Sequence, residues 1–192
     1  MARENRQGRP RASSRETLAE AACELFFEQG YEATSVSDIT ARAGVSRSSF
    51  FNYFASKHDV LWFGVDERID ALVDELAGAD GSDVADVLAR FADGLAPDSL
   101  ALALANAEPM GAAVDLDRES SRRARRIATA VAARLRSEGV ASLRADVLGS
   151  AFGGGLIASI WRWAQDGPGT TALADRLAEA LSYVAAMPGA PR

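Results

Sequence analysis

Apolar residues recur three and four positions apart along most of the chain, which is the spacing of one face of an α-helix. Short stretches with glycine, proline or aspartate interrupt this pattern and mark the ends of the segments. No stretch alternates apolar and polar residues as a half-buried strand does. The pattern predicts helices at 14–29, 36–43, 47–53, 57–77, 83–93, 97–107, 115–137, 141–165 and 170–187.

The residues at the ends of the early segments agree with this spacing. Ser35 and Asp38 have the spacing of a capping box, in which each side chain accepts a hydrogen bond from the other residue's backbone N–H. Ser46 can cap the segment that follows it. Gly30 and Gly44 stand where the preceding helices should end, since glycine readily adopts the left-handed conformation that closes many helices.

These segments predict an all-α protein of about nine helices. Hydrophobic residues make up 48% of the chain and charged residues 25%, as in ordinary globular proteins. The short helices come first and the long helices later. We therefore expect a flexible basic arm at 1–13, a small three-helix unit at 14–56 and a larger helical bundle at 57–192.

Charge is unevenly distributed along the chain. The net charge is −6, yet residues 1–57 carry eight basic and seven acidic side chains. The net charge of −6 for the whole chain argues against a protein that coats nucleic acid with its whole surface. A basic arm is typical of nucleic-acid-binding tails and also of solvated tails without a partner. Its arginines are Arg3, Arg6, Arg9, Arg11 and Arg15, with Glu4 as their acidic neighbour.

The cysteine count and the apolar runs indicate the compartment. The one cysteine, Cys23, excludes an internal disulfide and favours a reducing environment, and its place in the first helix is typical of a packed, inert thiol. The N-terminus is charged and lacks the apolar segment of a secretory signal. The longest uncharged run, 147–161, is too short and glycine-rich for a membrane span. We expect a cytoplasmic protein with no membrane partner.

The segments 36–43 and 47–53 have the arrangement of a helix-turn-helix. Gly44 allows a tight turn, Val45 fills the space between the helices, and Ser46 begins the second helix. That helix carries arginine and asparagine, which can bind guanine and adenine through paired hydrogen bonds, and hydroxyl groups that bind bases or phosphates. A plain structural corner between two short helices is the alternative.

The motifs Gly30–Val36, Asp38-Ile39, Ala43–Ser46, Phe50–Phe54 and Ser56-Lys57 together resemble the N-terminal signature of the TetR/AcrR family of repressors. The resemblance runs without a gap from about residue 14 to residue 61. It departs from the family at Ser48, where glycine is frequent, and at Ala55, where proline is frequent. The rest of the chain resembles the family only in the number and length of its helices.

The resemblance implies a homodimeric repressor that binds palindromic operator DNA. The second short helix of each chain would enter a major groove, with half-sites about one DNA turn, or a multiple of it, apart. It implies base contacts by Arg47, Ser48 and Asn52, and a thymine-methyl or sugar contact by Phe51. Phe50 and Phe54 would fill the core. The other expected DNA contacts, mostly to the sugar-phosphate backbone, are Thr34, Ser35, Ser46, Ser49, Tyr53 and Lys57.

The resemblance also implies that the larger domain binds a small-molecule effector, which we expect to be largely apolar. Its binding would tilt the helix that begins at Lys57 and release the DNA. Large apolar residues of this domain are candidates to line the pocket, with ordinary core packing as the alternative for each. They are Trp62, Phe63, Phe91, Leu95, Leu102, Met110, Ile127, Val131 and Phe152.

A dense group of arginines lies in the segment 115–137. A solvated face balanced by nearby acidic residues is the simpler interpretation. The alternative is an anion-binding patch at a pocket mouth, for a phosphate or an acyl-CoA head group, and Phe50–Trp62 slightly resembles regulators linked to acyl-CoA ligands. The cluster consists of Arg118, Arg122, Arg123, Arg125 and Arg126.

The last two long segments, 141–165 and 170–187, are those that usually pair between subunits in the family. Gly149 and Gly153–Gly155 lie inside the first of them, where each costs about 1 kcal/mol relative to alanine. We favour close packing at a dimer interface, with a kink or a ligand against the backbone as alternatives. The residues expected at the interface are Gly153, Leu156, Ile160, Trp161, Leu173, Leu177, Leu181 and Val184.

The motif content does not favour an enzyme. The chain has one histidine, His58, and lacks the GxSxG, HExxH, Walker and GxGxxG motifs. We expect no cofactor and no metal site. A helical scaffold, or a DNA-bound factor without an effector, remains an alternative, and a bundle core without an internal cavity would favour it over a ligand-responsive regulator.

Overall fold

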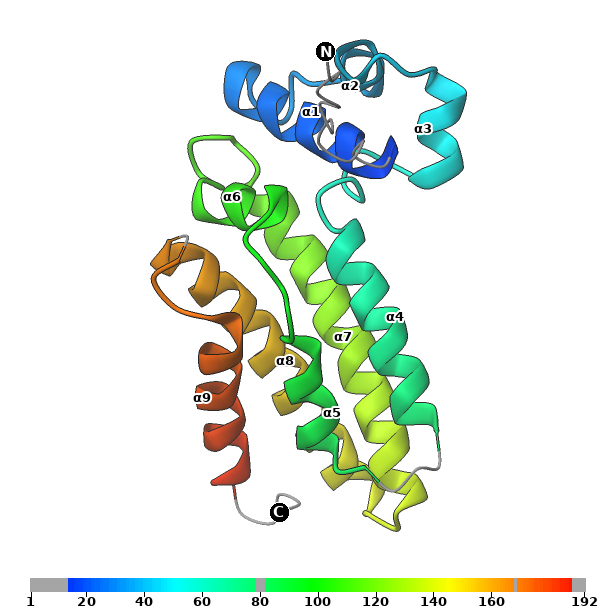
Figure 1. The fold of residues 1–192 in the computed structure, drawn as a ribbon. Helices are drawn as coiled ribbons and strands as arrows, with labels where there is room; N and C mark the ends of the chain where they lie inside the picture. Colours follow the sequence, from blue (N-terminus) through cyan, green and yellow to red (C-terminus); the bar gives the residue numbers. More distant parts are fainter. Residues whose placement is uncertain (1–13, 79–81, 168, 188–192) are drawn as a thin grey trace, which may run out of the picture.

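The computed structural model describes residues 14–78, 82–167 and 169–187. Within these ranges the chain forms nine α-helices and no β-strand (Figure 1), which confirms the predicted fold class. The basic arm predicted at 1–13 falls outside the described residues. The helices are α1 (Ser14–Gln29), α2 (Val36–Ala43), α3 (Arg47–Tyr53), α4 (Phe63–Ala77), α5 (Val84–Phe91), α6 (Ser99–Ala105), α7 (Ala113–Ser137), α8 (Ser142–Asp166) and α9 (Leu173–Ala185).

The first three helices have the predicted bounds, whereas α4 begins at Phe63 and the prediction that it starts near Lys57 is wrong. The hydroxyl and the backbone N–H of Ser56 both donate to the Asp59 carboxylate, at 2.9 and 3.0 Å. The N–H of Asp59 donates to the Ser56 carbonyl at 3.2 Å and closes a separate turn, and a second turn leads from Asp59 to Trp62. The link between the two parts of the chain is therefore a pair of turns followed by a helix.

Helices α1, α2 and α3 form a small unit at one end of the molecule, and α4, α5, α7, α8 and α9 form an elongated bundle (Figure 1). Helix α6 lies at the end of the bundle next to α1. The thiol of Cys23 on α1 donates to the carbonyl oxygen of Ser99 on α6 over 3.7 Å. Burial raises the pKa of this thiol to about 11, so it stays protonated at neutral pH.

The two longest helices, α7 and α8, lie against each other along most of their length. Gly149 and Gly153 stand one turn apart on the face of α8 that meets α7. A Cβ atom on Gly153 would lie 2.4 Å from the carbonyl oxygen of Ala124, and one on Gly149 would lie 2.4 Å from that of Ala128. The close approach expected from these glycines thus occurs within the chain, against α7, rather than against a second copy.

A buried arginine joins α4 to α7 just below the small unit. Arg123 on α7 is 2% exposed, and its guanidinium donates to Asp66 on α4 at 2.8 and 2.5 Å. It also donates to the Glu119 carboxylate at 2.8 Å and lies 4.3 Å from the ring centre of Trp62. Two carboxylates and an aromatic face offset the cost of burying the charge, and removing one partner would leave the arginine uncompensated.

Helix α8 is long and apolar enough to span a membrane by length and composition alone. Half of its most apolar window is buried against the rest of the chain. Burial of that extent is typical of a core helix, and α8 lies between α7 and α9 (Figure 1).

The glycine contact generates a matched pair of substitutions. Gly153→Ala should lower the free energy of unfolding by about 1–3 kcal/mol, because the new methyl group must push the α7 backbone away. Gly154→Ala should lower it less than Gly153→Ala does, because alanine favours a helix and a Cβ atom there meets no described atom of its own chain within 4 Å. Urea unfolding followed by circular dichroism at one protein concentration measures both. Equal effects of the two substitutions would contradict the α7–α8 contact.

Candidate nucleic-acid interface

Helices α2 and α3 are held at a fixed angle by the caps that the sequence predicts. Ser35 and Asp38 form the expected capping box at the start of α2. Gly44 ends α2 with a φ of +69°, and the N–H of Val45 donates to the Thr40 carbonyl at 3.0 Å. The Ser46 hydroxyl accepts from the N–H of Ser49 at 3.1 Å and caps α3. These contacts confirm the predicted turn between the two helices.

Helix α3 has an apolar face turned inward and a mixed face turned to solvent. Phe50 and Phe54 are buried, as predicted, and their rings lie 5.5 Å apart. Phe51 is 48% exposed, which is a large exposed fraction for a phenylalanine, although its ring centre lies 5.3 Å from that of Phe50. The other exposed residues of the outer face are Arg47, Ser48, Asn52 and Tyr53, with Ser49 half-buried beside them.

Arg47 is the cation that this face presents to solvent. Its guanidinium donates weakly to the hydroxyl of Ser37 on α2 over 3.4 Å and lies 5.6 Å from the ring centre of Phe51. Neither partner is a carboxylate, so the charge is available to a ligand. Ser37 was not among the predicted contacts, although its exposed position in the first turn of α2, next to the Ser35 cap, is a signal that the sequence contains.

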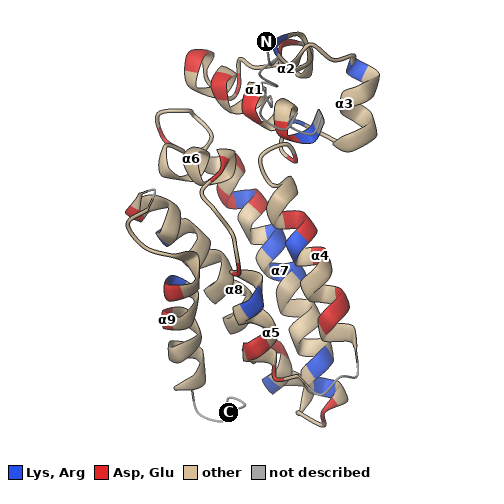
Figure 2. Cartoon of the chain, in the orientation of Figure 1, with Lys and Arg blue, Asp and Glu red and all other residues tan. Residues whose placement is uncertain are grey.

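The other described cations of this unit are in ion pairs. Figure 2 shows acidic positions spread along α1. Arg15 pairs with Glu67 on α4 and lies over the Tyr53 ring. Arg42 pairs with Glu24 and Glu28 at 3.0 and 2.5 Å, and this contact holds the pKa of Glu28 below its usual range. Arg42 therefore belongs to a surface network of charges.

Two predicted DNA-contacting side chains are used inside the protein. Thr34 is buried, and its hydroxyl donates to the Gly30 carbonyl at 2.8 Å. The Lys57 ammonium donates to the carbonyls of Tyr31 and Thr34 at 2.7 and 3.2 Å and lies 4.2 Å from the Tyr31 ring centre. The sequence could not separate this internal role from a phosphate contact, because both need a donor at that position.

The same region fixes the small unit to the bundle. The N–H of Tyr31 donates to the Met110 carbonyl at 2.8 Å, and the Tyr31 hydroxyl hydrogen-bonds His58. Asp115 of α7 lies 3.7 Å from the His58 ring nitrogen. Burial, reinforced by Asp115, raises the pKa of Tyr31, so the phenol stays protonated. A movement of α4 or α7 would therefore displace α1–α3 through these contacts.

The predicted effector-pocket residues do not gather around one cavity. Leu102 is exposed and borders a cavity of about 340 Å³ between α6 and α8, whereas a larger cavity lies elsewhere, between α4 and α7. Core packing, the alternative considered for each residue, describes the buried ones. Buried in the structure are Trp62, Phe91, Met110, Ile127, Val131 and Phe152, and half-buried are Phe63 and Leu95.

The predicted dimer-interface residues are largely covered within one chain. The indole N–H of half-buried Trp161 donates to the hydroxyl of Ser120 on α7 at 2.8 Å, and Leu181 is half-buried too. The buried ones are Gly153, Leu156, Ile160, Leu173, Leu177 and Val184. The exposed residues of α8 and α9 include Leu143, Val147, Ser150, Gly154, Ala158, Ala174, Ala178 and Tyr183.

No group of three or more histidine, cysteine, aspartate or glutamate side chains with the geometry of a metal site occurs in the described part of the chain. The arginine cluster on α7 is mostly paired with carboxylates. Arg118 pairs with Asp115, and Arg126 pairs with Asp70 on α4. Arg125 is the member for which the described residues offer no ion-pair partner.

Comparison with known proteins agrees with this geometry. The family model for bacterial regulatory proteins of the tetR family matches residues 18–61, which span α1, α2, α3 and the turns after them. A solved structure of Thermus thermophilus FadR, described as a TetR-family transcriptional repressor in complex with lauroyl-CoA, matches with a TM-score of 0.52. It is 25% identical and covers 93% of this chain and 96% of that one. Residues 18–61 thus match the tetR family of bacterial regulatory proteins, and the described helices have the fold of a TetR-family repressor.

Curated relatives match over a shorter length. MftR of Mycobacterium tuberculosis, provisionally named a mycofactocin biosynthesis transcriptional regulator, is 39% identical over 62 residues, 32% of this chain and 31% of that protein. The transcriptional activator FasR of Mycolicibacterium smegmatis is 37% identical over 71 residues, 36% of this chain and 32% of that one. The chain thus spans about a third of the length of these relatives.

The contacts of Lys57 generate a test of its role. Lys57→Met keeps the length of the side chain but leaves two carbonyls without their donor, so the free energy of unfolding should fall by about 1–3 kcal/mol. Arg15→Met, which removes an exposed ion pair of the same unit, should cost less than about 1 kcal/mol. Urea unfolding measures both. If Lys57→Met leaves the stability unchanged and lowers the slope of log affinity for DNA against log salt by about one, Lys57 contacts a phosphate instead.

Proposed function

We propose that this protein is a transcriptional repressor that binds a palindromic operator as a homodimer in the cytoplasm and is released by a small-molecule effector. The observation that carries the proposal is the outer face of α3, where Arg47, Ser48, Phe51 and Asn52 are exposed while Phe50 and Phe54 hold the helix in place. This is the set of side chains that reads base edges in a major groove.

The outer face suggests how sequence is read. Arg47 can donate two hydrogen bonds to a guanine, Asn52 can pair with an adenine, and Phe51 offers an apolar contact to a thymine methyl group. Ser35, Ser46 and Ser49 lie at the starts of α2 and α3, where hydroxyls and free backbone N–H groups favour phosphates. Tyr53 completes the rim beside Arg15.

The DNA-facing side has few cations that are free to neutralise phosphates, so the basic arm is part of the proposal. Arg15, Arg42 and Lys57 are engaged within the protein, which leaves Arg47 as the exposed cation of α3. Phosphate neutralisation supplies most of the affinity of such proteins. Arg3, Arg6, Arg9 and Arg11 of the sequence are the further cations available to the same DNA.

We place the dimer contact on the outward faces of α8 and α9. Val147, Ser150, Gly154 and Ala158 follow one another at helical spacing on α8, and all are exposed. Small side chains of this kind let two helices approach closely, which suits a pairing of α8 and α9 with their symmetry mates. Two α3 helices on one duplex require such a symmetric contact.

Repression and effector release are supported by the structural neighbour. FadR of Thermus thermophilus is described as a repressor bound to lauroyl-CoA and resembles this chain over nearly its whole length. The proposed effector is a small molecule with a large apolar part, bound in the helical bundle. An equal affinity for the DNA-bound and free states would shift nothing, so the effector must favour the free state.

Selection of binding sites from random DNA, followed by a gel-shift, tests the proposal. Arg47→Ala should weaken binding to the selected operator about 10- to 100-fold, in line with ~1–3 kcal/mol for a guanine contact. Arg42→Ala is the matched control, because Arg42 is an exposed arginine of the same unit that is paired with two glutamates. The affinity of this variant for the operator should stay within about threefold of the parent's. Absence of any sequence-specific, salt-sensitive binding would refute the proposed function.

The dimer contact has a test of its own. Gly154→Arg places a long cation on the outward face of α8 without meeting any atom of its own chain, so it should give a folded monomer. Ala71→Arg on the exposed face of α4 is the control and should remain a dimer. Sedimentation velocity distinguishes the two states. If Gly154→Arg remains a dimer as stable as the parent, the contact lies on another face.

A further inference from the structure

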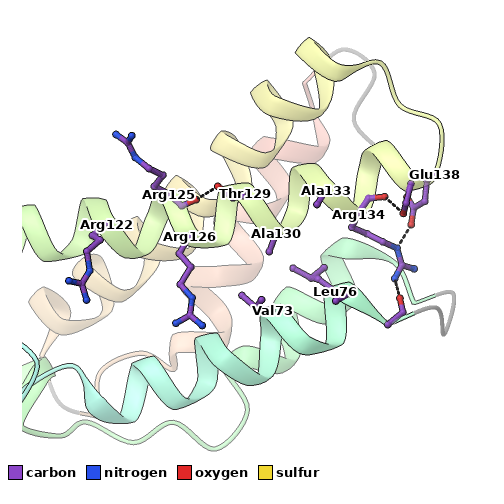
Figure 3. Close-up of a pocket in the computed structure, with 13 residues that line it drawn as sticks. Val73, Leu76, Arg122, Arg125, Arg126, Thr129, Ala130, Ala133, Arg134 and Glu138 are labelled. Atoms are coloured by element: carbon purple, nitrogen blue, oxygen red, sulfur yellow. Dashed lines mark hydrogen bonds and ion pairs between the residues drawn. The ribbon is translucent and has the colours of Figure 1, made fainter. Parts of the chain in front are cut away.

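An open groove of about 1110 Å³ lies between α4 and α7 (Figure 3). Pockets for small molecules commonly have volumes of about 300–1,000 Å³. None of the residues predicted to line an effector pocket borders this groove. Its lining runs along α7 from Arg122 to Glu138, a distance of about 24 Å at 1.5 Å per residue.

The lining has a basic end and an apolar stretch. Arg122, Arg125 and Arg126 form the end nearer to α1–α3. The next part is lined by Val73 and Leu76 of α4 and by alanines 130 and 133 of α7. The far end is closed by Arg134, which is tied to Glu138 and donates to the Gly78 carbonyl at 2.7 Å. The groove therefore offers a long apolar surface with positive charge concentrated at one end.

The arginines at the basic end can turn to a ligand at little cost. Arg122 is 67% exposed, and its carboxylate partners Glu119 and Asp59 lie 3.6 and 3.8 Å away. Arg126 is 46% exposed and pairs with the exposed Asp70. Exposed ion pairs of this kind are worth little, whereas a hydrogen bond from arginine to an anion in a partly enclosed groove is stronger.

Arg125 adds a charge that the described residues do not neutralise. Its backbone carbonyl accepts a hydrogen bond from Thr129, and no described carboxylate lies within ion-pair distance of its guanidinium. Figure 3 shows Arg122 and Arg126 extending toward α4 and Arg125 extending from the opposite side of α7. The lining holds four arginines and one glutamate, in a chain whose net charge is −6.

We propose that this groove binds an amphiphilic anion, a molecule with one carboxylate or phosphate head group on a long unbranched apolar chain. The head group binds Arg122 and Arg126, which extend toward α4, and the chain lies between α4 and α7 along Val73, Leu76 and Ala133. The groove would be the effector site of the proposed repressor, and the amphiphilic anion its class of effector. The regulatory consequence of binding rests on the proposed function.

That consequence follows from the contacts across the groove. The Arg126–Asp70 pair and the Arg123–Asp66 pair hold α4 to α7, and α4 leads through two turns into the unit that carries α3. An anion that binds Arg126 competes with Asp70 for it, and a chain lodged beside Val73 separates the two helices. Both changes move α4 relative to α7 and shift the position of α3.

Binding of dodecanoate and of dodecyl phosphate to the full-length protein, below their micelle concentrations and without DNA, tests the site by isothermal titration calorimetry. We expect saturable binding of at least one of the two, with one molecule per chain. The two probes separate a carboxylate from a phosphate head group. Dodecanol should bind at least about tenfold more weakly, because it lacks the charge, and acetate should show no saturable binding, because it lacks the chain.

Variants locate the site. Arg126→Gln and Arg122→Gln should each weaken binding of the anionic probe about tenfold, and Ala133→Phe, which fills the groove from an exposed position, should abolish it. Arg136→Gln is the matched control, since Arg136 is an exposed, ion-paired arginine of the same helix outside the groove, and its affinity should not change. Urea unfolding of each variant verifies that the fold is retained.

The outcomes separate this proposal from the proposed function. No saturable binding of either anion, equal binding of dodecanol, or unchanged binding in the folded groove variants would overturn the groove assignment. So would a change of subunit number in Ala133→Phe, because the groove would then be an interface between copies. Loss of sequence-specific DNA binding by the parent protein, with probe binding intact, would overturn the proposed function and leave the groove site standing.

Discussion

The close contact between α7 and α8 is the constraint on which the rest of the structure depends. Two turns of α8 carry no side chain where the helix meets the α7 backbone, and a methyl group at either Gly149 or Gly153 would approach a carbonyl oxygen to 2.4 Å. The pair forms an axis of the bundle, with α4 against one side of α7 and α9 against α8. A helix that tolerates two glycines at about 1 kcal/mol each must recover that free energy by packing.

The position of α4 follows from this axis. Arg123 projects from α7 into a site made by Asp66, Glu119 and Trp62, and it fixes the start of α4 beneath α1–α3. The Tyr31, His58 and Asp115 contacts continue the connection into the small unit. The outward face of α3 is therefore held by a chain of buried polar contacts, and an alteration of the α4–α7 spacing reaches it through few intermediates.

The sequence predicts the local structure of the small unit well, because its signals are local. Ser35, Gly44 and Ser46 act on their own turns, and the bounds of α1, α2 and α3 follow from them. The start of α4 differs from the prediction because Ser56 and Asp59 have the spacing of a capping box, whereas Ser56 donates both hydrogen bonds to the Asp59 carboxylate within an isolated turn.

Roles that depend on which surfaces meet could not be read from spacing. Lys57 has the properties of a phosphate ligand in sequence, and its internal acceptors are carbonyls from a loop 23 and 26 residues away. Gly153 has the properties of a dimer contact, and its neighbour is a helix of the same chain. Most of the apolar residues expected around an effector fill the core. The groove is lined largely by alanines and arginines, whose pattern in the sequence is typical of a solvent-exposed helix face.

The central claim is that two α3 helices, fixed by one dimer, read two half-sites of one duplex. The most direct test inserts base pairs at the centre of the selected operator and measures affinity by gel-shift. Because half-sites must face the dimer from the same side, an insertion of about five base pairs, half a DNA turn, should reduce affinity to the non-specific level. An affinity that does not depend on the spacing would contradict the account.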